Sequence, residues 1–201
     1  MAYASWVNPN KTTGNGNDTV AWTGSAHTGR TARTTTATFS ASGVESKTLT
    51  IIQAGATEFV TIDATAAVAK SGGTLTITGT SNSSKLTFSL TGTNGIGLVL
   101  PSSYTANSVT TNNGAAITGD PGAVQQYAFS ITFTGIDENT SISALTSQLT
   151  VTANGSQTAT CDITQAAGDA YLTISPTTIN LTAAGTAVSV TVTSNTSWSI
   201  S

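Results

Sequence analysis

The feature that most constrains the fold is an internal duplication, because two stretches of the chain resemble each other without a gap. Three pairs of segments share an offset of 112 positions: Thr38–Gly43 with Thr150–Gly155, Leu49–Ala54 with Cys161–Ala166, and Phe59–Ile62 with Tyr171–Ile174. A period of this size is the length of a whole domain, not of a single supersecondary repeat. The sequence therefore predicts one type of domain that occurs more than once.

The second copy is longer than the first by about twenty residues. Val20–Gly24 matches Ile131–Gly135 at an offset of 111, whereas Val7–Pro9 matches Val99–Pro101 at an offset of only 92. The additional residues lie near 102–126, a stretch rich in the turn formers Gly, Asn and Pro. Long irregular segments in compact domains are often functional and otherwise disordered. We weigh a contact loop against passive decoration evenly, and this insertion is the first candidate for a partner-contacting surface.

Apolar and polar residues alternate in many short segments. Examples are Leu75 and Ile77; Phe129, Ile131 and Phe133; Leu149 and Val151; and Val188, Val190 and Val192. This alternation is typical of half-buried strands, and Thr, which supplies about a fifth of the chain, is β-branched and favours them further. No window shows helical periodicity. The pattern predicts an all-β protein built of sandwich domains.

The copies differ in completeness. Residues 57–168 contain every segment of the repeat, residues 1–56 lack the opening strands, and residues 169–201 contain only opening strands. The two partial copies are therefore complementary halves of one domain, split between the ends of the chain. An open half exposes a sheet edge and an apolar face. Either the two ends of a chain meet, or neighbouring copies exchange halves.

Two groups of motifs resemble the BACON domain, a Bacteroidetes-associated module named for carbohydrate binding. Tyr171–Pro176 and Val188–Trp198 resemble the opening of this domain. Its remainder is similar to four further segments: Trp6–Pro9, Gly14–Asn17, Arg33 ahead of an alternating strand, and Ile52–Gly55. The match covers nearly the whole chain in pieces, apart from the insertion. The middle copy departs from the pattern where Lys85 and Leu86 replace the expected Trp and where Leu145 matches Arg33. The resemblance implies tandem immunoglobulin-like β-sandwich domains.

The family occurs in two settings, and the resemblance implies one of them. Its members are secreted Bacteroidetes proteins, usually beside glycan-active enzymes, or virion proteins of phages that infect such hosts. Residues 1–20 contain no apolar stretch, which predicts neither a signal peptide nor a membrane span. With no attached enzyme and a split domain suited to subunit exchange, we expect a virion protein, a capsid decoration or head-fibre subunit made in the host cytoplasm. The alternative is a secreted, extracellular carbohydrate-binding module.

The expected partners follow from the same reasoning: further copies of the chain, capsid or other virion proteins, and glycans. Nucleic acid is not expected, because charged residues make up only 7% of the chain and the net charge is −3. The six Lys and Arg residues are scattered singly, so no basic groove that could follow a phosphate backbone is visible.

The residues available for chemistry are few, since the chain has one His and one Cys. Catalysis by acid–base or nucleophilic groups needs titratable side chains within reach of each other. His27 lies in a polar loop and is expected at the surface, whereas Cys161 aligns with Leu49 and is expected to be a buried, inert thiol. Asp137–Asn139 has oxygen ligands that suit calcium, but a solvated turn is favoured. We expect no enzyme, no cofactor and no metal.

Aromatic side chains decide whether sugar stacking is feasible. Trp22 aligns with Phe133 in an alternating strand, and Trp198 is in phase with Ile200, so both are expected in a core once their domain is complete. The remaining candidates for contact with a partner or a glycan are Trp6, whose environment the sequence leaves ambiguous, Tyr104 in the insertion, and Tyr127 just after its end.

Overall fold

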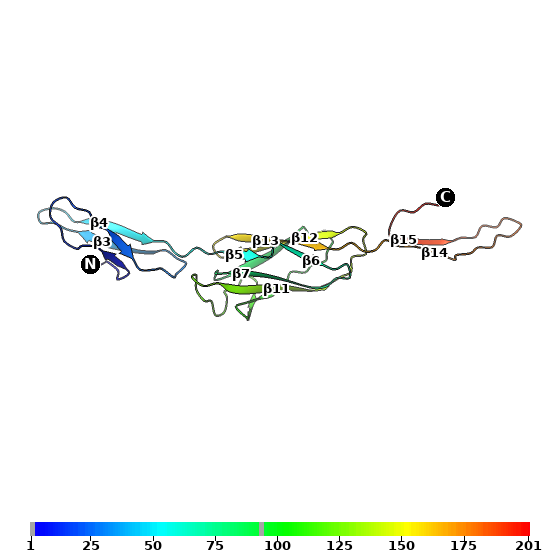
Figure 1. The fold of residues 1–201 in the computed structure, drawn as a ribbon, viewed down its shortest axis with the longest axis horizontal. Helices are drawn as coiled ribbons and strands as arrows, with labels where there is room; N and C mark the ends of the chain where they lie inside the picture. The colour runs from blue at the N-terminus through cyan, green and yellow to red at the C-terminus, as the bar shows by residue number, and fades with distance from the viewer. Residues whose placement is uncertain (1–2, 93–94) are drawn as a thin grey trace.

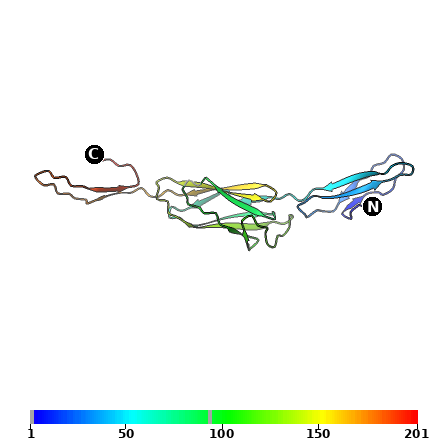
Figure 2. The ribbon, with the colours of Figure 1, turned by 180° about the vertical axis from the view of Figure 1, so that it is seen from behind.

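The computed structural model describes residues 3–92 and 95–201, and every regular element in them is a β-strand (Figure 1). The prediction of an all-β protein is thus confirmed. The strands form three modules in a row along an elongated molecule: an N-terminal module (residues 3–56), a central domain (57–168) and a C-terminal module (169–201) (Figures 1 and 2). In the described part of the chain, no helix is long and apolar enough to cross a membrane.

The central domain consists of two sheets. One has the strand order β10-β9-β11-β7-β5 and the other the order β6-β13-β12-β8. The bounds of the first are β10 Val109–Asn112, β9 Ser103–Ala106, β11 Tyr127–Ile136, β7 Gly73–Ser81 and β5 Val60–Ile62; those of the second are β6 Thr65–Val68, β13 Thr158–Gln165, β12 Leu145–Ala153 and β8 Leu86–Thr91. Neighbouring strands are antiparallel except β6 and β13, which are parallel.

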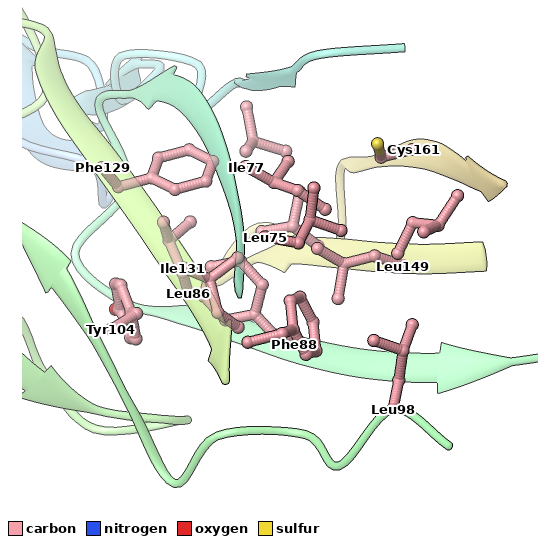
Figure 3. Packing of buried hydrophobic residues seen from close by; sticks show 14 of the residues in the cluster. Leu75, Ile77, Leu86, Phe88, Leu98, Tyr104, Phe129, Ile131, Leu149 and Cys161 are labelled. Atoms are coloured by element: carbon pink, nitrogen blue, oxygen red, sulfur yellow. The ribbon is translucent and has the colours of Figure 1, made fainter. Parts of the chain in front are cut away.

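One apolar core joins the two sheets into a β-sandwich (Figure 3). Because successive side chains of a strand point to opposite faces, the alternating apolar residues of β7, β8, β11, β12 and β13 all face this core. Phe88 of the four-stranded sheet contacts two rings of the other sheet, with centroid distances of 4.8 Å to Tyr104 and 5.7 Å to Phe129.

The insertion is ordered, so the expectation of a long irregular segment is wrong for its first half. Strands β9 and β10 form a hairpin that pairs with β11 and widens the five-stranded sheet. Its turn consists of Asn107 and Ser108, whose φ angles of 48° and 63° match the left-handed backbone that two-residue hairpin loops require. The hairpin buries Tyr104 and Ala106 against the core.

The terminal modules have fewer strands. The N-terminal module contains β1 Val7–Pro9 paired with β2 Trp22–Gly24, and β3 Arg33–Phe39 paired with β4 Lys47–Gln53. The C-terminal module contains one pair, β14 Leu172–Ser175 with β15 Thr191–Ser194. The two modules lie at opposite ends of the molecule with the central domain between them (Figures 1 and 2), so the two ends of one chain do not meet.

Strand registers show that the terminal modules repeat the two halves of the central domain. The equivalent pairs are Arg33–Gln53 of β3–β4 with Leu145–Gln165 of β12–β13, and Leu172–Ser194 of β14–β15 with Val60–Ser81 of β5–β7. Each pair keeps the offset of 112 or 113 that the sequence shows. The N-terminal module therefore has the counterparts of β11, β12 and β13, and the C-terminal module has those of β5 and the end of β7.

Candidate assembly surfaces

The C-terminal module exposes almost all of its apolar side chains. We call this set the C-terminal open face: Leu172, Ile174, Ile179, Leu181, Val188, Val190, Trp198 and Ile200. Trp198 is 51% exposed and Ile200 is 86% exposed. The side chain of Ile200 is therefore almost fully in contact with water. Its burial in an interface would be favourable by about 1.5–3 kcal/mol.

The counterparts of these residues in the central domain are buried. In the order C-terminal residue and central residue, the offset of 113 pairs Val188 with Leu75 and Val190 with Ile77. A one-residue gap after Thr196, which keeps the apolar alternation, pairs Trp198 with Leu86 and Ile200 with Phe88. All four central residues belong to the sandwich core. The C-terminal open face is thus the inner surface of a half sandwich that has no second half against it.

The N-terminal module also leaves apolar side chains uncovered. Phe39 is 45% exposed and Leu49 is exposed, although their central counterparts, Val151 and Cys161, are fully buried. Part of this surface is covered locally, since the Trp22 ring meets Phe39 edge-on with a centroid distance of 6.4 Å. We call the exposed Phe39 and Leu49 and the half-buried Trp22 and Ile51, together with the free edges of β2, β3 and β4, the N-terminal open face.

The free edge of β2 is the one that corresponds to the β7 side of β11. Alternate residues of a strand bond to opposite neighbours. Ala21 O accepts a hydrogen bond from Asn10 N, in the segment that continues β1 (2.9 Å). In β11, Ala128 O accepts a bond from Asn107 N beside β9 (3.0 Å). The counterpart of Ala21 is Thr132, which lies four residues after Ala128 and therefore bonds toward the same side of the strand. Strand β1 therefore occupies the β9 side of β2, and no strand among the described residues pairs with the opposite edge.

In the C-terminal module, Asn195 makes the same side-chain hydrogen bonds that its counterpart Asn82 makes in the central domain. Asn195 Oδ1 accepts a bond from Tyr171 N (3.0 Å), and Asn195 Nδ2 donates to Asp169 O (2.9 Å). Asn82 makes the same two bonds to Phe59 N and Thr57 O, at 2.7 and 2.9 Å. The start of the module therefore has the hydrogen bonds that its counterpart has inside a complete sandwich.

Two of the three residues proposed as partner or glycan contacts are buried. Tyr104 is 3% and Tyr127 is 4% exposed, and both rings belong to the core of the central domain. The hydroxyl of Tyr127 donates to Ser83 O at 2.7 Å. Their assignment to a contact surface is corrected, because each lies at an inward position of a strand and not in an irregular loop.

Trp6, the third candidate, is half-buried and already covered on one face. The Arg33 guanidinium carbon lies 4.5 Å from the centroid of its ring. That guanidinium is held in place by bonds to Gln53 Oε1 (2.9 Å) and Ser25 O (2.7 Å). A cation stacked in this way stabilises the N-terminal module, and it occupies one of the two ring faces that a sugar would use.

Trp198 is exposed in the structure, although the sequence predicts a core position for it in a completed domain. It lines a shallow groove with Ile142 and residues 194–197. This groove lies beside the junction between the central domain and the C-terminal module. Trp198 is thus the largest accessible aromatic surface among the described residues.

The junction between the N-terminal module and the central domain is fixed by Arg30. Its guanidinium donates two bonds to the Asp120 carboxylate (2.6 and 2.8 Å) and two to Asn82 O (2.5 and 3.2 Å), and Glu58 Oε1 lies 3.3 Å from Arg30 Nε. The hydrogen bond from Arg30 is the main cause that lowers the pKa of Asp120. At the second junction the counterpart of Arg30 is Ile142, which cannot form such a link.

The single histidine has a structural role in its loop. His27 Nε2 lies 2.7 Å from Thr31 O, and Gly29 N donates to His27 Nδ1 (3.4 Å). At the equivalent place in the central domain, the Asn139 amide bonds Ser143 O and Ser141 N in the same two directions, both at 2.9 Å. With the proton on Nε2, the imidazole ring supplies the donor and the acceptor that the amide supplies there.

The other residues considered for chemistry are also engaged or buried. Cys161 is fully buried, and burial raises the pKa of its thiol. Asn139 is buried with its amide bound to backbone groups, so Asp137–Asn139 forms a closed turn and does not point three oxygen ligands at one place. Within residues 3–92 and 95–201, no group of three or more His, Cys, Asp or Glu side chains could hold a metal ion.

Compared with models of known protein families and with curated protein sequences, the chain matches none.

Proposed function

We propose that the chain is a non-catalytic structural subunit of the virion of a phage that infects Bacteroidetes, a capsid decoration or head-fibre protein. The observation that carries the proposal is the pair of open faces at opposite ends of one elongated molecule. A chain with an apolar, half-sandwich surface at each end is suited to joining other protein subunits. The resemblance to immunoglobulin-like BACON domains supplies the virion setting.

The rest of the surface agrees with a passive structural role. The outward positions of the central strands are mainly Thr, as in Thr76 and Thr132, whose hydroxyls lie 3.0 Å apart across β7 and β11. Such a surface is solvated by hydroxyl groups and carries little charge. It suits a subunit that is displayed in many copies without nonspecific electrostatic binding.

The test is the location of the protein in phage particles. Antibodies against the central domain are applied to purified particles of a phage that encodes the chain, with immunogold labelling and mass spectrometry of the same preparation. We expect regular label on the capsid or on fibres and many copies per particle. A particle-free culture supernatant that contains all of the protein would contradict the virion assignment.

The alternative of a secreted carbohydrate-binding module is favoured by the exposure of Trp198 beside its groove. Affinity electrophoresis through gels that contain mucin or plant polysaccharides would measure it. Retardation that is lost in Trp198→Ala, with Trp6→Ala as the comparison, would support sugar stacking. Unchanged mobility at all polysaccharide concentrations would remove this alternative.

A further inference from the structure

We infer that the C-terminal module of one copy completes the N-terminal module of a second copy, which makes an intermolecular sandwich and joins copies head to tail. The inference rests on the proposed structural function, for which it names the partner: a second copy of the chain. The central domain is the template, because it contains both halves in one chain with the same strand registers.

Three strand contacts of the template define the expected interface. In the central domain, β11 pairs Phe133 with Leu75, β12 pairs Val151 with Phe88, and β13 pairs Ile163 with Ala66. The counterparts, in the order N-terminal module and C-terminal module of another copy, are Trp22 with Val188, Phe39 with Ile200, and Ile51 with Ile179; the second pair includes the one-residue gap after Thr196. Every one of the six counterparts is an apolar residue, as a core requires.

The alignment of the third contact is supported by a turn that occurs both in the central domain and in the C-terminal module. Gly72 N donates to Ala69 O (3.0 Å), and Gly185 N donates to Thr182 O (2.9 Å), an offset of 113. At the same offset, Ala66 and Val68 of β6 correspond to Ile179 and Leu181. Residues 178–181 form no strand in the C-terminal module, and in the template the partner of β6 is β13, whose counterpart β4 belongs to the other module.

Free strand edges in both modules match the same arrangement. The unpaired edge of β2 is the one that faces β7 in the template, while β3 and β4 lack the neighbours that β8 and β6 provide for β12 and β13. In the C-terminal module, β15 is paired only with β14, so the edge equivalent to the β11 side of β7 is free. Each half therefore offers what the other half lacks.

The polarity of this contact predicts an open chain of copies. The donor surface and the acceptor surface are different and lie at opposite ends of the molecule, so the contact is heterologous. Each copy would add one complete domain and one composite domain to a linear assembly. A symmetric contact between two identical faces would instead stop at a dimer.

The test uses two full-length variants that each block one end. Val190→Asp places a carboxylate on the donor face, where the counterpart Ile77 is buried, and Leu49→Asp does the same on the acceptor face. The matched control is Thr50→Asp, which lies on the outer side of β4 at the position where the central domain has Asp162. Sedimentation velocity and light scattering measure the size of each protein over a range of concentrations.

We expect the parent chain and Thr50→Asp to form concentration-dependent oligomers, and each blocked variant to associate at least about 100-fold more weakly, because a buried unpaired carboxylate is strongly unfavourable. An equal mixture of the two blocked variants should give dimers and nothing longer, since it contains one intact donor and one intact acceptor. Dimer formation in the mixture also shows that both variants are folded. A monomeric parent chain, or continued dimerisation of either blocked variant alone, would overturn the inference.

A second measurement tests the strand register. Phe39→Cys combined with Ile200→Cys places two thiols on residues that the template sets directly opposite each other, within reach of a disulfide. Because these positions lie at opposite ends of one molecule, a disulfide between them must join two copies. Oxidation should give a ladder on a non-reducing gel, whereas Phe39→Cys with Ser199→Cys, which faces the other way, should not. Equal ladders from both would contradict the register.

Failure of the inference and failure of the virion assignment give different results. A monomeric chain that is still found on phage particles would leave the virion assignment and remove self-assembly. Oligomers with the expected register that are absent from particles would do the reverse.

Discussion

At the scale of single residues, His27 and Asn139 show that different side chains close the same loop in the two copies. Both make one bond to a carbonyl and one bond from a backbone N–H. We predict that His27→Asn keeps the loop closed, whereas His27→Ala removes both bonds and destabilises the loop by about 1 kcal/mol. Hydrogen exchange of residues 25–31, measured by mass spectrometry, should be unchanged in the first variant and several-fold faster in the second. Equal exchange in both would contradict a structural role for the imidazole.

Tyr127 gives the central domain a dependence on alkaline pH. Burial raises the pKa of its phenol to about 12, whereas an unfolded tyrosine ionises near 10. Between these values the unfolded state loses a proton that the folded state keeps, so the free energy of unfolding falls as pH rises from about 10 to 12, by about 2–3 kcal/mol. The stabilisation is fully present below pH 10.

Urea unfolding at pH 7 to 12 measures this effect, with Tyr127→Phe as the comparison. The variant loses the bond to Ser83 O, which costs about 1 kcal/mol at pH 7, and its stability should decline less at high pH. Part of the decline should remain, because burial also raises the pKa of Tyr104. Parallel pH profiles for the two proteins would show that Tyr127 is not the source.

At the scale of elements, the contact of Arg30 with Asp120 and Asn82 holds the N-terminal module against the central domain. Arg30 lowers the pKa of Asp120, so this stabilisation is present above the ordinary carboxyl pKa of 3.8 and is lost as pH falls through the lower folded value. The site is partly exposed, so solvent screening limits its contribution to about 1 kcal/mol or less. The expected effect is therefore on the orientation of the modules more than on their unfolding.

We predict that Arg30→Gln broadens the distribution of inter-module distances and makes residues 54–57 more sensitive to proteases at pH 7. Small-angle X-ray scattering and limited proteolysis measure these two effects. Lys47→Gln is the matched control, because the pair of Lys47 with Glu45 (3.1 Å) lies within one module and is exposed. Identical cleavage of Arg30→Gln and of the parent chain would show that the link does not hold the junction.

The sequence predicts the strands in which apolar and polar residues alternate over many positions. The apolar residues of β7, β11, β12 and β13 alternate over several positions, and the duplication in the sequence predicts which segments of the two copies correspond. It did not find β9 and β10, because Tyr104 and Ala106 are the only inward residues of β9 and the Asn107–Ser108 turn lacks the glycine that usually marks a hairpin. Burial of Tyr104 follows from that missed hairpin, whereas Tyr127 is buried as an inward residue at the start of β11.

The contact between Arg30 and Asp120 also could not be predicted from the sequence. Arg30 and Asp120 are separated by 90 positions, and both are single charges in polar segments. Nothing in the spacing of either residue distinguishes it from an ordinary solvated side chain. The contact arises only because the insertion, which the first copy lacks, turns back toward the junction between the modules.

At the scale of the whole molecule, the open faces and the scarcity of charge together determine how association should respond to salt. In the C-terminal module, the only charged side chain is Asp169, and it pairs with Lys70 of the central domain. The residues expected to meet across the interface, such as Trp22 with Val188, are apolar. Association between copies should therefore depend on apolar burial and not on attraction between charges.

We predict that raising NaCl from about 50 to 500 mM, which shortens the screening length several-fold, changes the association constant by no more than about 2-fold. Ammonium sulfate at equal ionic strength should strengthen association, because sulfate is excluded from protein surfaces and favours burial. Light scattering of the parent chain at fixed concentration measures both effects, with Val190→Asp as the non-assembling control. A steep loss of mass in NaCl would mean that charged groups hold the copies together. It would then exclude the apolar open faces as the main contact between copies.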